Sequence, residues 1–225
     1  MTGLVAKPHA MNIHTVLWTT AMINSSSFDP EFGGETYPSP SPNFQEALDC
    51  NYFVNQGMTY FWWKGTGGGV DFFSPDATAW MHRQEDNALS TGIDGFKLDF
   101  AENYVGGATV HDAMFDTASG MVSRQTYSER YYQYFLAYGR AKNGPEFMTM
   151  TRAWDASYGF PWRLYAKKEN SPISWMGDQR RDYSGLAKAL NEELVSAAAG
   201  YVAPGADIAM ASGSDLGDGI PLMRS

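Results

Sequence analysis

Short apolar segments alternate along the chain with longer segments whose apolar positions have helical spacing. The short segments predict β-strands over residues 12–20, 58–63, 95–100, 146–151, 173–176 and 200–203. The longer segments predict helices over residues 43–55, 75–90, 127–140 and 183–199. Strands that alternate with helices in this way are typical of βα units, so we expect a parallel sheet covered by helices.

Several local signals set the boundaries of these elements. Ser74 is the expected N-cap of the helix that begins at Pro75, since proline suits the first helical position. Thr91-Gly92 is expected to end that helix before the next strand. The glycine-rich segment Gly65–Gly69 predicts a loop.

Two carboxylates follow apolar runs, at what should be the C-terminal ends of strands. Asp99 lies near the end of the run Phe96–Phe100, and Asp178 comes shortly after the aromatic segment Ser174–Met176. An α/β barrel has its chemistry at this end of its strands. One carboxylate as nucleophile and one as proton donor are what retaining cleavage of a glycosidic bond requires.

The segments Lys97–Glu102 and Trp175–Asp178 carry a resemblance to a known family. They resemble the Lys-x-Asp-x-x-Glu strand and the Trp-x-Gly-Asp segment of glycoside hydrolase family 31, whose members are retaining α-glucosidases, α-xylosidases and α-galactosidases. Further segments resemble that family in the expected order, at residues 16–18, 70–72, 150–152 and 205–208.

The resemblance implies an α/β fold, a partial (β/α)8 TIM barrel that spans roughly strands 3 to 7 of the family's catalytic domain. Residues 1–225 are then expected to form a single incomplete barrel domain, with the flanking strands and accessory β-domains absent. A complete barrel has about 250 residues. We therefore expect the chain to be an excerpt of a larger protein. Because an opened barrel exposes strand edges, we expect the isolated chain to aggregate or to unfold with weak cooperativity.

The resemblance also implies roles for individual residues. Asp99 would be the nucleophile and Asp178 the acid/base, with carboxyl groups about 5 to 6 Å apart as retention requires. Arg152 would contact the sugar in the cleaved subsite. The other expected substrate-binding residues are Trp63, Lys97 and Trp175. Glu102 fits a hydrogen-bonding partner of the site better than a catalytic group.

Structural roles remain open for the same residues. Asp99 could pair with Lys97, because residues two apart on a strand share a face. Asp178 could serve as a turn residue beside the arginines at 180 and 181, and Asp182 fits the N-cap of the helix after it. Arg163 is a weaker rival of Arg152.

Trp62 and Trp63 are as suited to core packing as to a sugar pocket. Asp71 and Asp207 resemble family positions that are mostly buried and hydrogen-bonded.

Composition narrows the classes of partner. The chain is 44% hydrophobic and 15% aromatic with a formal charge of −9, which argues against a nucleic-acid partner and suits a neutral sugar. The sequence has no apolar segment of membrane-spanning length and no signal-peptide pattern, although the resemblance favours an extracellular or secretory location. Cys50 is the single cysteine, and the four histidines are scattered.

No cofactor is expected, because the sequence contains neither a metal-binding His/Cys pattern nor a phosphate-binding glycine loop. The expected partner is an α-linked oligosaccharide or glycoside. The family implies α-glucosides first, then α-galactosides and α-xylosides. The alternative hypothesis is a non-hydrolytic or inactive sugar-binding barrel fragment. The oligomeric state is not predicted by any pattern in the sequence.

Overall fold

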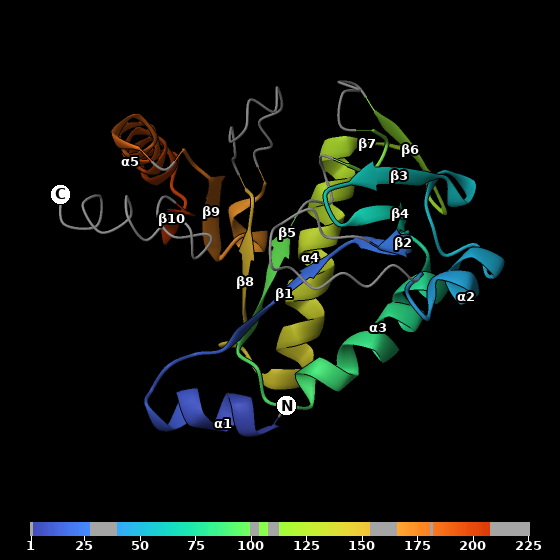
Figure 1. Ribbon diagram of the computed structural model, residues 1–225, viewed down its shortest axis with the longest axis horizontal. Helices are drawn as coiled ribbons and strands as arrows, with labels where there is room; N and C mark the ends of the chain where they lie inside the picture. Colours follow the sequence, from blue (N-terminus) through green and yellow to red (C-terminus); the bar gives the residue numbers. More distant parts are fainter. Residues whose placement is uncertain are drawn as a thin grey trace. The chain divides into compact units, whose positions relative to one another are not determined.

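The computed structural model describes residues 2–27, 40–99, 104–107, 113–153, 166–180 and 182–207. The chain divides into two compact units, residues 1–148 and residues 149–225. The first unit contains α1 (Thr2–Ala10), β1 (Val16–Thr20), β2 (Met22–Ser27), α2 (Phe44–Asp49), η1 (Asn55–Gly57), β3 (Thr59–Trp62), β4 (Gly65–Gly69), α3 (Pro75–Leu89), β5 (Gly95–Asp99), β6 (Met114–Thr117), β7 (Gly120–Ser123) and α4 (Arg124–Asn143) (Figure 1). Next come β8 (Met148–Thr151), η3 (Lys168–Asn170), β9 (Ile173–Asp178), α5 (Tyr183–Ala198) and β10 (Pro204–Asp207).

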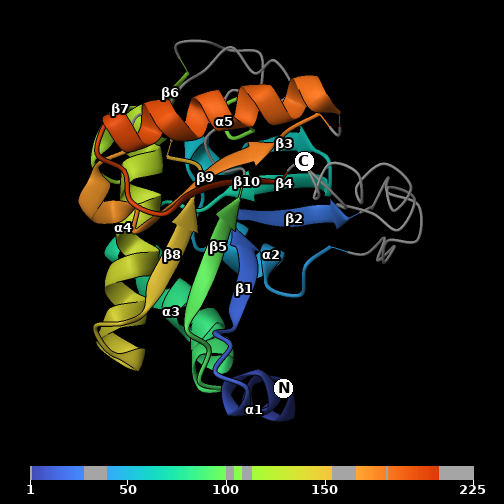
Figure 2. The same cartoon turned by 90° about the vertical axis from the view of Figure 1, so that its left-hand side faces the viewer.

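Parallel strands form the sheet that carries the candidate site. In the first unit β1 lies parallel to β5, with Val16 paired to Gly95 and Thr20 paired to Asp99, and Figure 2 shows the two arrows side by side. In the second unit β9 is parallel both to β8 and to β10. Parallel strands accompanied by helices confirm the prediction of an α/β fold, and the sheet is that of a partial barrel which does not close.

A three-stranded antiparallel sheet in the order β2-β4-β3 corrects two predictions. The segment Gly65–Gly69 is its central strand rather than a loop, and the segment near 58–63 pairs with it as β3 instead of forming a strand of the parallel sheet. Glycine is required there because a Cβ at Gly67 would lie 2.5 Å from the Ile23 carbonyl oxygen. Glycines that signal a loop in the sequence here permit close packing of strands.

Two long helices, α3 and α4, pack against each other, and α4 also packs against β5. Helix α3 begins as predicted, with the Ser74 side chain accepting a hydrogen bond from the Ala77 N–H. Helix α4 is capped by Ser123, which is the last residue of the β6–β7 hairpin. The sequence pattern did not predict this hairpin. The interior between these elements is aromatic. Rings within 6.1 Å of Phe72 are those of Tyr127, Tyr131, Tyr134 and Phe135.

In the second unit α5 packs on β9 and β10. Asp182 caps α5 by accepting a hydrogen bond from the Gly185 N–H, which confirms its predicted role. The last strand is Pro204–Asp207, so the prediction of a strand over 200–203 was wrong. Gly200 has φ of +88° and Ala203 φ of +47°, and these left-handed conformations turn the chain before the strand begins.

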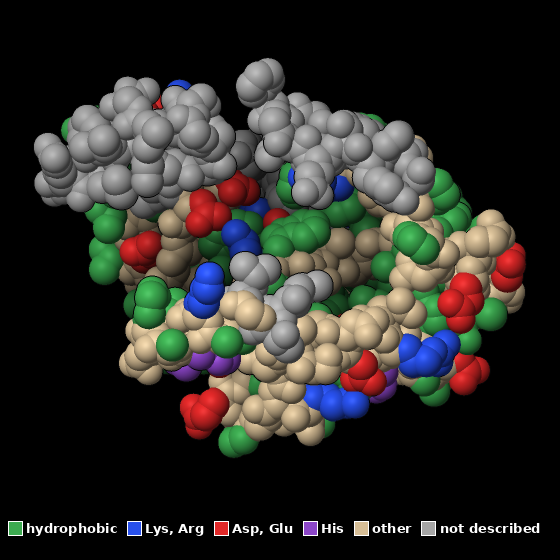
Figure 3. Space-filling model, turned by 60° about the horizontal axis from the view of Figure 1, so that its bottom comes forward, with side chains coloured by type: hydrophobic (Ala, Val, Ile, Leu, Met, Phe, Trp, Pro, Cys, Tyr) green, Lys and Arg blue, Asp and Glu red, His purple; other side chains and the backbone are tan. Residues whose placement is uncertain are grey.

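Exposed hydrophobic side chains are spread over several elements. On the face drawn in Figure 3, hydrophobic side chains (green) are interspersed with acidic (red) and basic (blue) ones. The most exposed include Leu194 on α5, Phe61 on β3 and Met11 after α1. None of the helices that the structure describes is both long and apolar enough to cross a membrane.

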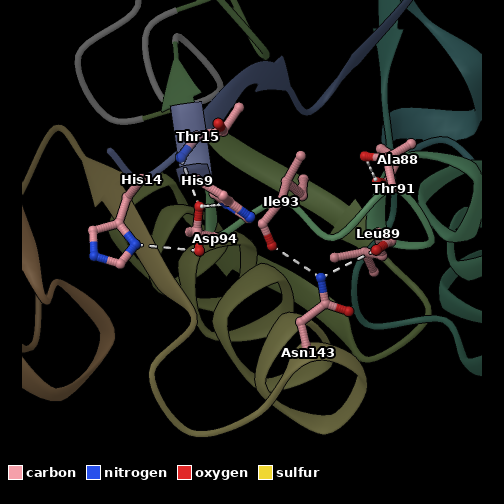
Figure 4. Close-up of polar contacts among 9 residues, drawn as sticks. All are labelled: His9, His14, Thr15, Ala88, Leu89, Thr91, Ile93, Asp94 and Asn143. Atoms are coloured by element: carbon pink, nitrogen blue, oxygen red, sulfur yellow. Dashed lines mark hydrogen bonds and ion pairs between the residues drawn. The ribbon is translucent and has the colours of Figure 1, made fainter. Parts of the chain in front are cut away.

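Helix α1, which the sequence pattern did not predict, is held near the N-terminal end of β5. The Asp94 carboxylate accepts hydrogen bonds from the Thr15 N–H (2.6 Å) and His9 Nε2 (2.7 Å), and His14 Nδ1 lies 3.2 Å from its other oxygen (Figure 4). Helix α1 contains Pro8 and has no clear apolar stripe, which removes the usual sequence signals for a helix.

Candidate active site

The pleat of β5 separates a packing face from a polar face. Phe96 and Leu98 are buried, and Phe96 contacts Phe135 of α4 edge to face. Lys97 and Asp99 therefore share the opposite face, because side chains alternate along a strand. The neighbouring strand β1 brings Trp18 and Thr20 to that same face, since Trp18 pairs with Lys97 and Thr20 with Asp99.

Asp99 is the last residue of β5 and is only 4% exposed. Its Oδ2 accepts a hydrogen bond of 2.9 Å from the Trp18 indole Nε1. A charge-assisted hydrogen bond from a rigid indole fixes the orientation of the carboxylate. The arrangement suits a nucleophile, which must present one oxygen to a reacting atom in a defined direction.

Three indoles form a cluster, and one of them, Trp18, contacts this carboxylate. The rings of Trp18 and Trp62 are nearly parallel with centroids 6.3 Å apart, and Trp63 meets both edge-on. Trp62 is anchored by its Nε1, which donates to Asn24 Oδ1 at 2.7 Å. The Lys64 ammonium lies 4.1 Å from the Trp63 ring centroid. Aromatic faces of this kind can pack against the C–H faces of a sugar ring.

In the second unit, Asp178 ends β9 in the same way that Asp99 ends β5. Gly177 has φ of +74°, a conformation that favours glycine, and it lies one residue before β9 ends at Asp178. The Asp178 side chain is 27% exposed. A carboxylate with this access can exchange a proton with a substrate atom or with water.

Arg152 joins Asp178 to Trp175. It follows β8 directly, and its side chain is fully buried. Its Nη2 donates to Asp178 Oδ2 at 3.0 Å, while the guanidinium carbon lies 3.8 Å from the Trp175 ring centroid. A planar guanidinium stacked on an indole is well suited to hold a carboxylate in one orientation.

Comparison with known proteins identifies the family. The domain described as the glycosyl hydrolases family 31 TIM-barrel domain matches residues 1–210. The chain belongs to glycosyl hydrolase family 31. This confirms both the resemblance read from the two motifs and the prediction of a barrel fold.

Two curated relatives of this chain are named α-xylosidases. One, from Emericella nidulans, is 26% identical over 173 residues, which cover 75% of this chain and 20% of the relative. The other, from Lactiplantibacillus pentosus, is 28% identical over 143 residues, 62% of this chain and 16% of the relative. The chain thus spans about a fifth or less of the length of these relatives.

A solved family 31 α-xylosidase from a soil metagenome, complexed with xylose, has a similar structure. The TM-score is 0.66 at 19% identity, over 92% of this chain and 28% of the other. At that identity the likeness concerns the fold. Together with the family match, it supports a glycosidase fold for this chain without fixing the substrate.

Other family 31 positions that the sequence suggested have mixed outcomes. Asp71 is buried as expected, and it accepts hydrogen bonds from the Phe73 and Ala118 N–H groups. Asp207 is exposed, which contradicts the expectation of a buried carboxylate, because β10 ends there. Glu102 and Arg163 lie outside the described residues.

Trp175 is 3% exposed, with its ring against Arg152, and Lys97 is half-buried on the same face as Asp99. Their contact with substrate, like that of Trp63, remains a prediction.

Trp18 was not among the residues singled out from the sequence. A signal was available, since Trp18 and Thr20 alternate with Leu17 and Thr19 on β1, and the segment 16–18 already resembled a family 31 strand. What the sequence lacked was the pairing register that aligns β1 with β5.

Among the described residues, no group of three or more His, Cys, Asp or Glu side chains is arranged to hold a metal ion.

Proposed function

We propose that this chain carries the catalytic groups of a retaining α-glycosidase, with Asp99 as nucleophile and Asp178 as acid/base. The observation that carries the proposal is that each carboxylate is the last residue of a parallel strand in a family 31 barrel domain. Active sites of such barrels are built at the C-terminal ends of the strands. Each carboxylate also has a donor that orients it, Trp18 for Asp99 and Arg152 for Asp178.

The proposed reaction has two steps. Asp99 attacks the anomeric carbon, the glycosidic C–O bond breaks, and Asp178 gives its proton to the departing oxygen. Asp178 then takes a proton from water, which attacks the same carbon and releases the sugar from Asp99 with its α configuration retained. The Arg152 contact fits the ionised state that Asp178 needs in this second step, while the exposed part of its carboxyl group leaves access for the proton.

The proposed substrate is a terminal α-glycoside of a neutral sugar. The names of both curated relatives support an α-xyloside, and the family at large supports an α-glucoside. The tryptophan cluster beside Asp99 fits the apolar face of either ring. We therefore propose that these two substrates be compared first, with the α-galactoside third.

The proposal is tested by assaying the 225-residue chain for hydrolysis of three substrates. These are p-nitrophenyl α-xyloside, p-nitrophenyl α-glucoside and p-nitrophenyl α-galactoside. We expect release of p-nitrophenol, with the α-anomer of the sugar as the first product seen by proton NMR. Asp99→Asn should abolish turnover, and the exposed carboxylate variant Asp49→Asn should retain it. A β-anomer as first product, or full activity in Asp99→Asn, would contradict the proposal.

Asp178 has a separate diagnostic. With a glycosyl fluoride, which needs no proton to leave, Asp178→Ala should still form the glycosyl-enzyme, and added azide should yield an α-glycosyl azide. Formation of a β-azide would assign Asp178 a different role. Sugar binding without any turnover in the unsubstituted chain would favour the alternative of a non-hydrolytic sugar-binding segment.

A further inference from the structure

A second cleft lies within the first unit, between the segment η1–β3 and the strand β6. Its volume is about 640 Å³. The side chains that shape it are those of Asn55, Gln56, Met58, Tyr60, Met114 and Asp116. None of these residues belongs to the tryptophan cluster or to the Asp99 contacts described above.

The polar groups of this cleft are already held in place by one another. Asn55 Nδ2 donates to the Tyr60 hydroxyl at 2.7 Å, and Asn55 Oδ1 accepts from the Asp116 N–H at 2.7 Å. Gln56 Nε2 lies 3.2 Å from Asp116 Oδ2 and donates to it. Within the described part of the chain, no hydrogen bond occupies Asp116 Oδ1 or Gln56 Oε1. These two oxygens are therefore available as acceptors for the hydroxyl groups of a ligand.

The backbone on one side of the cleft adopts an uncommon conformation. Asn55 and Gln56 have φ of 53° and 57°, in the left-handed region that non-glycine residues rarely adopt. Such conformations raise the free energy of the backbone and are concentrated at ligand sites. The amide side chains of these two consecutive residues both hydrogen-bond to Asp116 on β6.

The chemistry of the lining selects a class of ligand. The described residues that line it include one carboxylate, two amides and a phenol, and none of them is Lys, Arg or His, so an anionic ligand would meet repulsion there. The thioethers of the exposed residues Met58 and Met114 and the half-buried ring of Tyr60 supply apolar contact. Hydroxyl acceptors beside an aromatic ring and apolar edges are what a neutral sugar requires.

We propose that this cleft is an accessory binding site for a neutral sugar unit of an oligosaccharide. The choice of sugar rather than another polyol rests on the proposed glycosidase function. The site would hold the substrate chain through Asp116 and Gln56, without taking part in bond cleavage.

Methionine methyl NMR on the 225-residue chain tests the site directly. The Asp99→Asn variant, labelled at its methionine methyl groups, is titrated with isomaltotriose, and the Met58 and Met114 signals are assigned with Met58→Leu and Met114→Leu. We expect both signals to shift in a saturable manner. Adding Asp116→Ala or Gln56→Ala should weaken binding about tenfold, as loss of a hydrogen bond to a charged or amide acceptor does. The surface variant Asp49→Ala should leave the titration unchanged.

The outcomes separate this site from the proposed reaction. Unmoved Met58 and Met114 signals, an equal shift in Asp116→Ala whose free spectrum is otherwise intact, or a shift caused by inorganic phosphate would overturn the accessory site. Hydrolysis is measured independently in the chain that retains Asp99. Hydrolysis with unmoved methyl signals would support the proposed function and rule out the accessory site. Saturable methyl shifts without hydrolysis would support the accessory site and count against the proposed function.

Discussion

The Trp18 indole orients the Asp99 carboxylate through a hydrogen bond of 2.9 Å. Phenylalanine at this position keeps an aromatic ring against Trp62 but removes the N–H donor. Because a hydrogen bond to a charged group contributes about 1.5 to 3 kcal/mol, we expect Trp18→Phe to lower kcat by about 10- to 100-fold. Steady-state kinetics on the best p-nitrophenyl α-glycoside measure this, and an unchanged kcat with a raised KM would instead make Trp18 a residue that only binds substrate.

Arg152 supports Asp178 by a contact that lysine cannot reproduce, because lysine lacks a planar group to stack on Trp175. We expect Arg152→Lys to lower the free energy of unfolding by about 2 to 3 kcal/mol and to reduce kcat. Arg180→Lys is the matched control, since Arg180 pairs with Asp182 at the surface with its side chain 82% exposed and should change stability by less than about 0.5 kcal/mol. Urea unfolding of the two variants gives the comparison. Equal effects would mean that the burial of Arg152 has no energetic consequence.

Glu85 on α3 is a buried carboxyl group outside the candidate site. Desolvation raises its pKa to about 8, and the nearby Tyr134 hydroxyl offsets this only in part. Since the folded state favours the protonated form, the contribution of Glu85 to stability is most favourable below the ordinary carboxyl pKa. It declines as pH rises from about 4.5 toward 8.

Glu85→Gln should therefore remove most of this pH dependence. We expect the variant to be more stable than the unsubstituted chain at pH 8 by up to about 4 kcal/mol, with little difference at pH 5. Urea unfolding at both pH values measures this, and the exposed Glu46→Gln serves as the control. A variant that is destabilised equally at both pH values would show that Glu85 is ionised in the folded chain.

At the scale of elements, α1 depends on one carboxylate at the start of β5. Partial burial by itself would raise the pKa of Asp94, but hydrogen bonds from Thr15, His9 and His14 outweigh it and the pKa lies below its ordinary value. Asp94 therefore stabilises the fold above the pKa it has when unfolded. This stabilisation is lost as pH falls through the lowered value in the folded state.

Asp94→Ala should destabilise α1 more than the other helices, because the Asp94 side chain accepts hydrogen bonds both from His9 of α1 and from the Thr15 N–H in the segment after it. We expect an overall destabilisation of about 1 to 2 kcal/mol at pH 7 and faster amide hydrogen exchange in residues 2–10 than in α3. Hydrogen exchange followed by mass spectrometry checks this. Unchanged protection of α1 would show that other contacts hold the helix.

The elements that the sequence predicted well have local causes. Ser74-Pro75 and Asp182 specify where α3 and α5 begin, because caps act within a few residues. The strand β4 was not predictable in this way. Its glycines are explained by distant neighbours, since a Cβ at Gly68 would lie 2.9 Å from the Phe53 ring and one at Gly69 would lie 2.7 Å from Val105. Such neighbours are known only once the chain has folded.

At the scale of the whole molecule, the two candidate catalytic carboxylates belong to different compact units, Asp99 to residues 1–148 and Asp178 to residues 149–225. The sequence predicted both of them from short motifs, because each motif is a run of only a few consecutive residues that includes the end of a strand. It did not predict Trp18, whose relation to Asp99 depends on the pairing of strands about 80 residues apart. Motifs thus predicted the candidate reacting groups, and the folded structure was needed for the residues that orient them.

Covalent labelling with a 5-fluoro-α-glycosyl fluoride tests the central claim most directly. The fluorine at C5 slows both steps and fluoride is a good leaving group, so the glycosyl-enzyme accumulates. We predict one sugar per chain by intact mass, mapped by peptide sequencing to Asp99 and absent from Asp99→Asn. A label on another residue, or labelling that persists in Asp99→Asn, would contradict the assignment of Asp99 as the nucleophile.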